Sequence, residues 1–274
     1  MFVLSGSLII PGCDLSKTNT ENTPQETKKE NISKSDTVTV EDMRQELAKN
    51  ILNFKETNYE DETTGYIIQV KYPEIKYSDP KFEKFGNAIN VKISAHIKDK
   101  IDYFISEVEN WGSTPEDIEM TTKSGLYTSY EISMLNPKLI SIKFDNSMYH
   151  AGAAHPDTYT TVLNYDVEND KELIIENIFK NDSGWEQALS DNVVPRLNER
   201  IKTDFEFDDL PWIKEGAGPK AENFTVFTLS QNGINFTWDP YLLAPYAAGP
   251  QSITVQYSEI ENFFQINIAD YLQN

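Results

Sequence analysis

Cysteine is nearly absent from this sequence: Cys13 is the only one among 274 residues. A disulfide within the chain is therefore excluded, and so is a metal site built from cysteine thiolates. A catalytic thiol is also a poor explanation, because Cys13 lies only a few residues from the start of the sequence. The cysteine needs a different chemical role.

Basic residues are also scarce. The chain has 24 Lys and Arg against 44 Asp and Glu, which gives a formal net charge of −20. No nucleic-acid partner is expected, because binding of the phosphate backbone requires clustered Lys and Arg. The negative charge permits attraction to a strongly basic partner, although a solvated acidic surface is the more ordinary interpretation.

The sequence contains no apolar run long enough to span a bilayer, which takes about 20 residues. Residues 2–10 (FVLSGSLII) are short and apolar, as in the hydrophobic segment of a secretory signal peptide. Ile10-Pro11-Gly12-Cys13 resembles the lipobox of bacterial lipoproteins, in which the cysteine is acylated and becomes the new N-terminus. Pro11 is unusual in that motif and residues 1–12 contain no Lys or Arg, so we expect the true start to lie upstream of Met1.

These features predict a signal peptide over residues 1–12, a lipid on Cys13, and a lipid-anchored position in the cell envelope, on the periplasmic or extracellular face. Residues 13–36 follow as the lipidated cysteine and a disordered tether, because they carry almost no apolar side chains to bury. The membrane, reached through the N-terminal lipid, is then one partner. The alternative is a cytosolic protein with a frayed apolar N-terminus.

The pattern of apolar residues from residue 37 onward predicts an α+β fold. Apolar residues recur every three or four positions over residues 80–108, which indicates a helix about seven turns long. Further helices are predicted at 40–52, 183–201 and 258–264, and strands at 65–72, 125–134, 139–149, 158–167, 172–175, 224–230, 234–238 and 251–257. Neighbouring strands are expected to form antiparallel sheets, each packed against one long helix, as two small subdomains in tandem.

Three stretches of the sequence resemble a known bacterial pair of domains. The N-terminal domain of PdaC-type peptidoglycan deacetylases is similar to residues 66–75 (YIIQVKYPEI) and 85–90 (FGNAIN). The C-terminal domain of RsiV-type anti-sigma factors is similar to residues 152–156 (GAAHP), 164–166 (NYD), 173–179 and 239–249 (DPYLLAPYAAG). The resemblance implies a PdaC-type α+β domain over residues 37–150 and an RsiV-type α+β domain over residues 151–274.

The resemblance also implies a class of function. RsiV-type ectodomains bind lysozyme at the cell surface, so we expect this ectodomain to bind an extracellular ligand, either a basic protein such as lysozyme or a peptidoglycan fragment. Neither a deacetylase catalytic domain nor a sigma-binding segment is recognisable, so neither activity is implied.

Two alternatives remain open. The first is an envelope hydrolase of glycans or peptides, which for glycans would need two carboxylates about 5 Å or about 6.5–9.5 Å apart. The second is a structural or assembly lipoprotein without a small ligand.

No catalytic residue, cofactor or metal is predicted. His150 and His155 are close in sequence, with Asp157 as the nearest third ligand, but short histidine spacings are weak signs of a metal site. Hydrogen bonding within the fold is the preferred interpretation of His155. His96 lies at the margin of the apolar stripe of the long helix and is expected to be a half-buried structural residue.

The segment 238–250 (WDPYLLAPYAAGP) is the strongest candidate for a binding surface. Trp238, Tyr241 and Tyr246 offer rigid aromatic contacts, and the proline and glycine residues limit the entropy lost on binding. Together with His155, these three are the predicted ligand-binding residues. The alternative, which we favour for an aromatic run, is that the tyrosines and the two leucines fold inward as core.

Overall fold

A computed structural model of the chain describes residues 51–77, 83–110, 122–136 and 138–272. All of the described residues belong to one compact unit of the chain. The predicted signal peptide, Cys13 and the predicted tether lie outside the described residues, as do residues 40–50 of the first predicted helix.

The larger sheet has six strands in the order β1–β2–β3–β4–β5–β6. The strands are β1 (Ile51–Glu62), β2 (Tyr66–Tyr77), β3 (Ser124–Leu135), β4 (Leu139–Tyr149), β5 (Asp157–Asp166) and β6 (Lys171–Glu172). Strands β2 and β3 are parallel, whereas every other neighbouring pair is antiparallel as predicted. The parallel pair follows from helix α2 (Glu83–Asn110), which lies between these strands in sequence and returns the chain to the same end of the sheet.

Strand β1 is absent from the sequence-based prediction. Its first residues, Ile51 and Leu52, were expected to end a helix. The segment has few apolar residues, so its pattern is weak, but it pairs with β2 along most of its length. β1 and β2 form a hairpin across residues 63–65, so backbone hydrogen bonding to the strand that follows decides the conformation of β1, which its own weak apolar pattern does not report.

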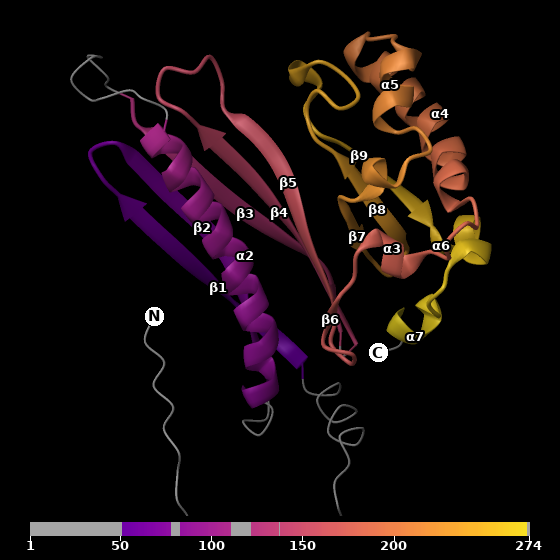
Figure 1. Cartoon of the computed structure of the whole chain (residues 1–274), viewed down its shortest axis with the longest axis horizontal. Helices are drawn as coiled ribbons and strands as arrows, with labels where there is room; N and C mark the ends of the chain where they lie inside the picture. The colour runs from indigo at the N-terminus through magenta and orange to yellow at the C-terminus, as the bar shows by residue number, and fades with distance from the viewer. Residues whose placement is uncertain (1–50, 78–82, 111–121, 137, 273–274) are drawn as a thin grey trace, which may run out of the picture. The chain divides into compact units, whose positions relative to one another are not determined.

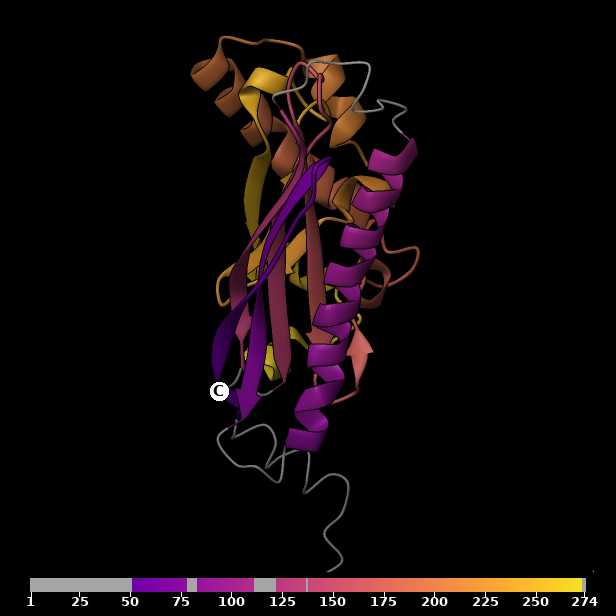
Figure 2. The same ribbon diagram turned by 90° about the vertical axis from the view of Figure 1, so that its left-hand side faces the viewer.

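Helix α2 covers one face of the six-stranded sheet, as the two views in Figures 1 and 2 show. Its buried apolar residues are spaced by three or four positions, as predicted: Ile89, Ile93, Ile97, Ile101 and Phe104. They pack on Ile68, Val70, Leu126, Ile140, Ile142 and Phe144 of the sheet. The side chain of Asn90 also accepts a hydrogen bond from the Ile75 amide (2.8 Å) and donates one to its carbonyl (2.9 Å), which fixes the helix to β2.

The smaller sheet has three antiparallel strands in the order β7 (Phe227–Leu229), β8 (Gly233–Trp238) and β9 (Gln251–Gln256). Helix α4 (Trp185–Phe205) packs against it, with Pro195 inside the helix. The core between them is rich in aromatic side chains: Phe179, Trp185, Phe224, Phe227, Phe236 and Trp238. Two sheets with one long helix each confirm the predicted α+β class.

Short elements complete the C-terminal half. These are α3 (Ile175–Ile178), α5 (Leu210–Gly216), α6 (Tyr257–Ile260), α7 (Ile268–Leu272) and the 3-10 turns η2 (Ala221–Phe224), η3 (Tyr246–Ala248) and η4 (Glu261–Phe263). No helix in the described part of the chain is long and apolar enough to cross a membrane.

The six-stranded sheet crosses the boundary that the sequence places between residues 150 and 151. Strand β5 lies beyond that boundary, yet it pairs with β4 along its whole length. Buried hydrogen bonds then link the sheet to β7: Asn164 Nδ2 donates to the Phe227 carbonyl (2.8 Å), and the Leu229 amide donates to Ser141 Oγ (2.9 Å). The subdomains therefore share a sheet and are not joined by a simple linker.

Candidate functional site

The part of the chain that the structure describes contains a groove of about 610 Å³. Its floor is the face of the six-stranded sheet that points away from α2, because the strands alternate and α2 covers the other face. One wall comes from the segment that follows β8. The lining residues are Asn58, Tyr59, Glu60, Gln69, Val70, Lys71, Tyr127, Thr128, Ser129, Asp145, Asn146, Ser147, Thr158, Tyr159, Thr160, Asp239, Pro240 and Pro250.

The centre of the groove is aromatic and neutral. Tyr127 of β3 lies there, and 42% of its surface is exposed. Ser129 and Ser147, on the same face of β3 and β4, and Gln69 of β2 supply hydroxyl and amide groups around it. An exposed ring surrounded by neutral hydrogen-bonding groups can stack on a flat ligand and hold its polar substituents.

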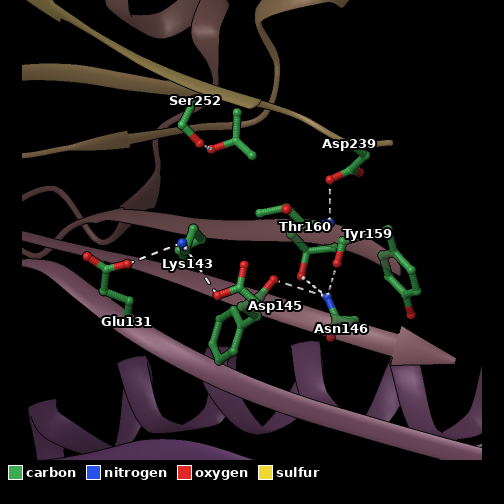
Figure 3. A network of polar contacts seen from close by, with 11 residues as sticks. Glu131, Lys143, Asp145, Asn146, Tyr159, Thr160, Asp239 and Ser252 are labelled. Carbon is green, nitrogen blue, oxygen red and sulfur yellow. Dashed lines mark hydrogen bonds and ion pairs between the residues drawn. The ribbon is translucent and has the colours of Figure 1, made fainter. Parts of the chain in front are cut away.

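One end of the groove is acidic. Asp239, directly after β8, accepts a hydrogen bond from the Thr160 amide of β5 (2.9 Å), and Thr160 pairs with Asp145 of β4. Figure 3 shows Asp239 reaching the sheet at Thr160, close to Asp145 and Asn146. Burial raises the pKa of the Asp239 carboxyl, and the nearby charges of Asp157 and Asp145 raise it further.

The lysines of this face are held in ion pairs. Lys143 lies 3.2 Å from the Glu131 carboxylate and 3.4 Å from that of Asp145 (Figure 3). Lys71, which lines the groove, lies 3.7 Å from the carboxylate of Glu56. Both pairs are partly exposed, so they add little stability, but they do neutralise the two cations.

Three of the four predicted binding residues come together. His155 stacks on Tyr246 with ring centroids 4.1 Å apart, and the Tyr241 hydroxyl lies 3.4 Å from His155 Nε2. Tyr246 donates to the Pro156 carbonyl (2.9 Å), which His155 Nδ1 also contacts (2.9 Å). His155 therefore has the hydrogen bonds expected of a structural histidine while its ring stays exposed.

His155, Tyr241 and Tyr246 form an aromatic cluster. Its two tyrosines belong to the same chain segment as the groove-lining residues Pro240 and Pro250. Tyr241 follows the lining residue Pro240, is 53% exposed, and has a left-handed backbone with φ of 71°. A non-glycine residue rarely adopts that conformation without a reason in the surrounding structure. Here the turn holds the Tyr241 carbonyl where it accepts a hydrogen bond from Trp212 Nε1 (3.0 Å).

Trp238 does not belong with this cluster, which corrects its predicted role as a binding residue. It is 1% exposed and packs among Phe224 and Phe236 in the C-terminal core. It is the last residue of β8, and the alternation of that strand directs it inward. The neighbouring leucines divide: Leu243 is buried, as the core interpretation requires, whereas Leu242 is 48% exposed.

A second polar group of residues lies on the opposite face of the sheet, beneath α2. Thr161 Oγ1 contacts His96 Nε2 (3.0 Å), the Lys100 ammonium, and Asn146 Nδ2 (3.4 Å). Burial lowers the pKa of His96 to about 4, assisted by the charge of Lys100, and burial lowers the pKa of Lys100 to about 8. His96, Lys100 and Thr161 lie between helix and sheet and do not line the groove, whereas Asn146 contacts Thr161 and is also a lining residue.

The sequence-based prediction missed the floor of the groove. Tyr127, Asp145 and Asp239 were read as parts of strands and of a loop. A signal exists in retrospect, because a two-layer fold leaves one face of the sheet open to solvent, and β3 places the large aromatic Tyr127 on that face together with Ser129 and Glu131. No group of three or more His, Cys, Asp or Glu side chains in the described ranges is arranged to hold a metal ion.

Comparison with known families finds two matched regions, in the same order as the PdaC-type and RsiV-type resemblances in the sequence. Residues 59–158 match the family described as deacetylase PdaC, and residues 176–258 match DUF3298, a family described as a protein of unknown function. The chain thus carries a PdaC region followed by a DUF3298 region, and the predicted two-domain order is confirmed. The groove has its floor largely in the first region and its wall, at Asp239, Pro240 and Pro250, in the second.

One curated relative is the peptidoglycan-N-acetylmuramic acid deacetylase PdaC of Bacillus subtilis (strain 168), which is 29% identical over 171 residues. The match covers 61% of this chain and 36% of the relative, so the chain spans about a third of that protein's length.

Two solved structures share the fold. A DUF3298 family member from Bacteroides fragilis has a TM-score of 0.51 at 18% identity, over 80% of this chain and 97% of its own. A DUF3298 family protein from Pseudomonas aeruginosa PAO1 has a TM-score of 0.51 at 10% identity, over 78% and 96%.

Proposed function

We propose that this chain is an envelope protein whose groove binds a glycan fragment of peptidoglycan. The printed activity of the Bacillus subtilis relative concerns peptidoglycan, which supports a place in the envelope. Because the chain corresponds to about a third of that relative, its deacetylase activity is not carried over. Ligand binding is the role that the matched regions and the groove support together.

The observation that carries the proposal is the exposed ring of Tyr127 at the centre of a groove of about 610 Å³. Sugars bind proteins by stacking their apolar face on an aromatic ring while their hydroxyls meet amide and hydroxyl groups. Ser129, Ser147 and Gln69 provide those groups on the same face. The volume lies in the range of small-molecule pockets, which supports a ligand of a few sugar rings.

A binding experiment tests the proposal directly. The protein is titrated with tetra-N-acetylchitotetraose and with muropeptides in a calorimeter, and the Tyr127→Ala variant is compared with Tyr103→Ala. Tyr103 is 54% exposed on α2, away from the groove, so it is a matched control. We expect Tyr127→Ala to weaken binding about tenfold, as loss of one stacked ring does, and Tyr103→Ala to leave it unchanged.

Other outcomes count against the proposal. If neither glycan binds, or if both tyrosine variants behave alike, the groove is not a glycan site. Release of shorter glycans during the titration would instead favour the hydrolase alternative, for which Asp239 and Asp145 are the available acids.

We also propose that Cys13 anchors the protein by a lipid at the envelope membrane. The support is the apolar segment before the cysteine and the polar segment after it. The Cys13→Ser variant should lose metabolic labelling with palmitate and move from the membrane fraction to the soluble fraction. A variant that stays on the membrane without label would show that another feature holds it there.

A basic protein such as lysozyme is the second candidate ligand, favoured by a different surface. The α4–α5 surface, residues 204–210, carries the exposed apolar residues Phe205 and Leu210 among the acids Asp204, Glu206, Asp208 and Asp209 in sequence. Helix α5 is held beside the segment after β8, because Trp212 donates to the Tyr241 carbonyl. Exposed apolar residues that alternate with acids suit a cationic protein with apolar anchors.

The two candidates are separated by variants on the two surfaces. If lysozyme is the ligand, Phe205→Ser with Leu210→Ser should weaken its binding at least tenfold, and added salt should weaken it further. Tyr127→Ala should then have no effect on lysozyme. The reverse result, loss with Tyr127→Ala alone, would place lysozyme binding at the groove.

A further inference from the structure

The lining of the groove contains more carboxylates than free cations. Glu60, Asp145 and Asp239 line it, and Lys71 is its lysine. Lys71 is engaged by Glu56, whose carboxylate is 3.7 Å away. The groove itself therefore presents a net negative charge to a ligand, in addition to the negative net charge of the whole chain.

Two of these carboxylates lack a cation among the described residues. Glu60 and Asp239 form no ion pair there, whereas Asp145 shares Lys143 with Glu131. Asp239 accepts hydrogen bonds from Thr160, including one from its amide (2.9 Å), but has no cation beside it among the described residues. A half-buried carboxylate without a cation interacts strongly with a cationic ligand, because the surrounding dielectric is lower than that of water.

The backbone places Asp239 and Asp145 at the same end of the groove. Thr160 joins them, since it bonds Asp239 through its amide and is the β-sheet partner of Asp145. Both acids lie on the face that α2 does not cover, next to the neutral centre around Tyr127. A ligand stacked on Tyr127 would extend a neighbouring ring toward these carboxylates.

We infer that the groove selects glycans in which a sugar carries a free amine in place of the N-acetyl group. The inference rests on the proposed function and names the substrate class of that same site. An N-acetylated sugar is neutral and gains nothing from Asp145 and Asp239. A sugar with a free amine is cationic below about pH 7, like other amines of low pKa, and its ammonium can donate charge-assisted hydrogen bonds to both carboxylates.

The experiment compares glycans that differ only in the acetyl groups. Tetra-N-acetylchitotetraose and its fully de-N-acetylated counterpart, the glucosamine tetramer, are titrated at about pH 6, where the amine is protonated. We expect the amine-bearing tetramer to bind about tenfold more tightly, as one charge-assisted hydrogen bond allows. The preference should decline as salt rises.

Variants assign the preference to the groove. Asp145→Asn with Asp239→Asn keeps the shape of both side chains and an acceptor for the Thr160 amide, so the fold should persist, as a thermal melt would verify. This pair should remove the preference for the amine-bearing tetramer over the acetylated one. Asp191→Asn, on the exposed side of α4, removes a similar charge elsewhere and should preserve the preference.

The outcomes separate the inference from the proposed function. Equal or tighter binding of the acetylated tetramer overturns the inference and leaves the proposed function standing. A preference that survives in the Asp145→Asn, Asp239→Asn protein also overturns it, because the attraction would then come from the overall charge. Tighter, competing binding of tetralysine would show that the site takes a basic peptide. Failure of both tetramers to bind ends both proposals.

Discussion

The cores beneath the two long helices differ in chemistry. Beneath α2, apolar side chains surround a polar group that includes Lys100 (7% exposed), His96 and Thr161. Beneath α4, the core is apolar and rich in stacked and edge-on aromatic rings, such as Phe179 on Trp185 with centroids 4.8 Å apart. Each core has one helix on one sheet, so the layer architecture does not set this difference.

The difference indicates a division of roles. An apolar aromatic core is stable over a wide range of pH, since it contains no group that must change its charge. The core beneath α2 contains a buried lysine, Lys100, that has no carboxylate partner among the described residues. Removing its charge from water lowers the free energy of unfolding. The α4 half thus acts as the rigid support of the groove wall, and the α2 half, which carries the groove floor, is the part that responds to pH.

The largest expected effect tests the aromatic core. Phe236→Ala removes a ring that is fully buried between Phe224 and Trp238. We expect a loss of about 3–5 kcal/mol in the free energy of unfolding, from the lost burial and the cavity left behind. Urea denaturation measures it, with the half-exposed Leu242→Ala as a control that should change stability by less than about 0.5 kcal/mol. A small loss in Phe236→Ala would mean that this core is not the rigid half.

The second effect has the opposite sign. Lys100→Met keeps the apolar stem and removes a buried charge whose pKa is lowered from 10.5 to about 8. The shift corresponds to at most about 3 kcal/mol, so the variant should be more stable than the parent by up to that amount at neutral pH.

The pH dependence of this gain follows from the sign of the shift. Below pH 8 both the folded and the unfolded parent are protonated at Lys100, so the cost of burial is complete. Between about pH 8 and 10.5 the folded state has lost the proton and the unfolded state still binds it, so the stability of the parent rises with pH. The gap between Lys100→Met and the parent should therefore close over that window; a gap that is constant with pH would show that the charge is not the cause.

A smaller loss is expected where the two halves meet. Asn164→Ala removes the bond to the Phe227 carbonyl (2.8 Å) and the acceptor that Ser141 Oγ uses (2.6 Å). Two buried groups then lack partners, at a cost of about 2 kcal/mol in the free energy of unfolding. Double-variant analysis with Phe236→Ala should give additive losses if the cores are independent, and a coupling above about 0.5 kcal/mol if the shared strands join them.

The smallest effect concerns the aromatic cluster. His155→Ala removes the ring stacked on Tyr246, but the histidine is exposed and Tyr246 keeps its bond to the Pro156 carbonyl. We expect a loss below about 1 kcal/mol in the free energy of unfolding, measured in urea. A loss as large as that of Phe236→Ala would mean that the cluster is part of the core.

Sequence reasoning succeeded where one face of an element is buried continuously. The long helix α2 has isoleucines at regular spacing, and β4 alternates between buried and more exposed residues from Ile142 to Tyr149, so their positions follow from local pattern. These features depend on neighbours in sequence.

It failed where the structure depends on pairing that the apolar pattern of one segment does not report. The strand β1 has few apolar residues and is formed by pairing with β2 in a hairpin, and the parallel register of β2 with β3 depends on where α2 delivers the chain. The groove combines residues from strands and from the segment after β8, which no local pattern brings together. Trp238 and Tyr241 lie close in sequence, but one is at the inward-facing end of a strand and the other is in an exposed turn, so one motif gave two opposite environments.

The strands shared by the two halves limit how this chain can be divided. Met134 of β3 and Leu139 of β4 lie in the core of the α4 half, although both precede residue 151. A chain cut at residue 150 would leave its C-terminal piece with an uncovered apolar surface and with the amide of Leu229 without its Ser141 partner. Recombination between relatives would therefore succeed most readily when strands β3 to β5 are exchanged together, a unit that runs past the end of the PdaC match at residue 158.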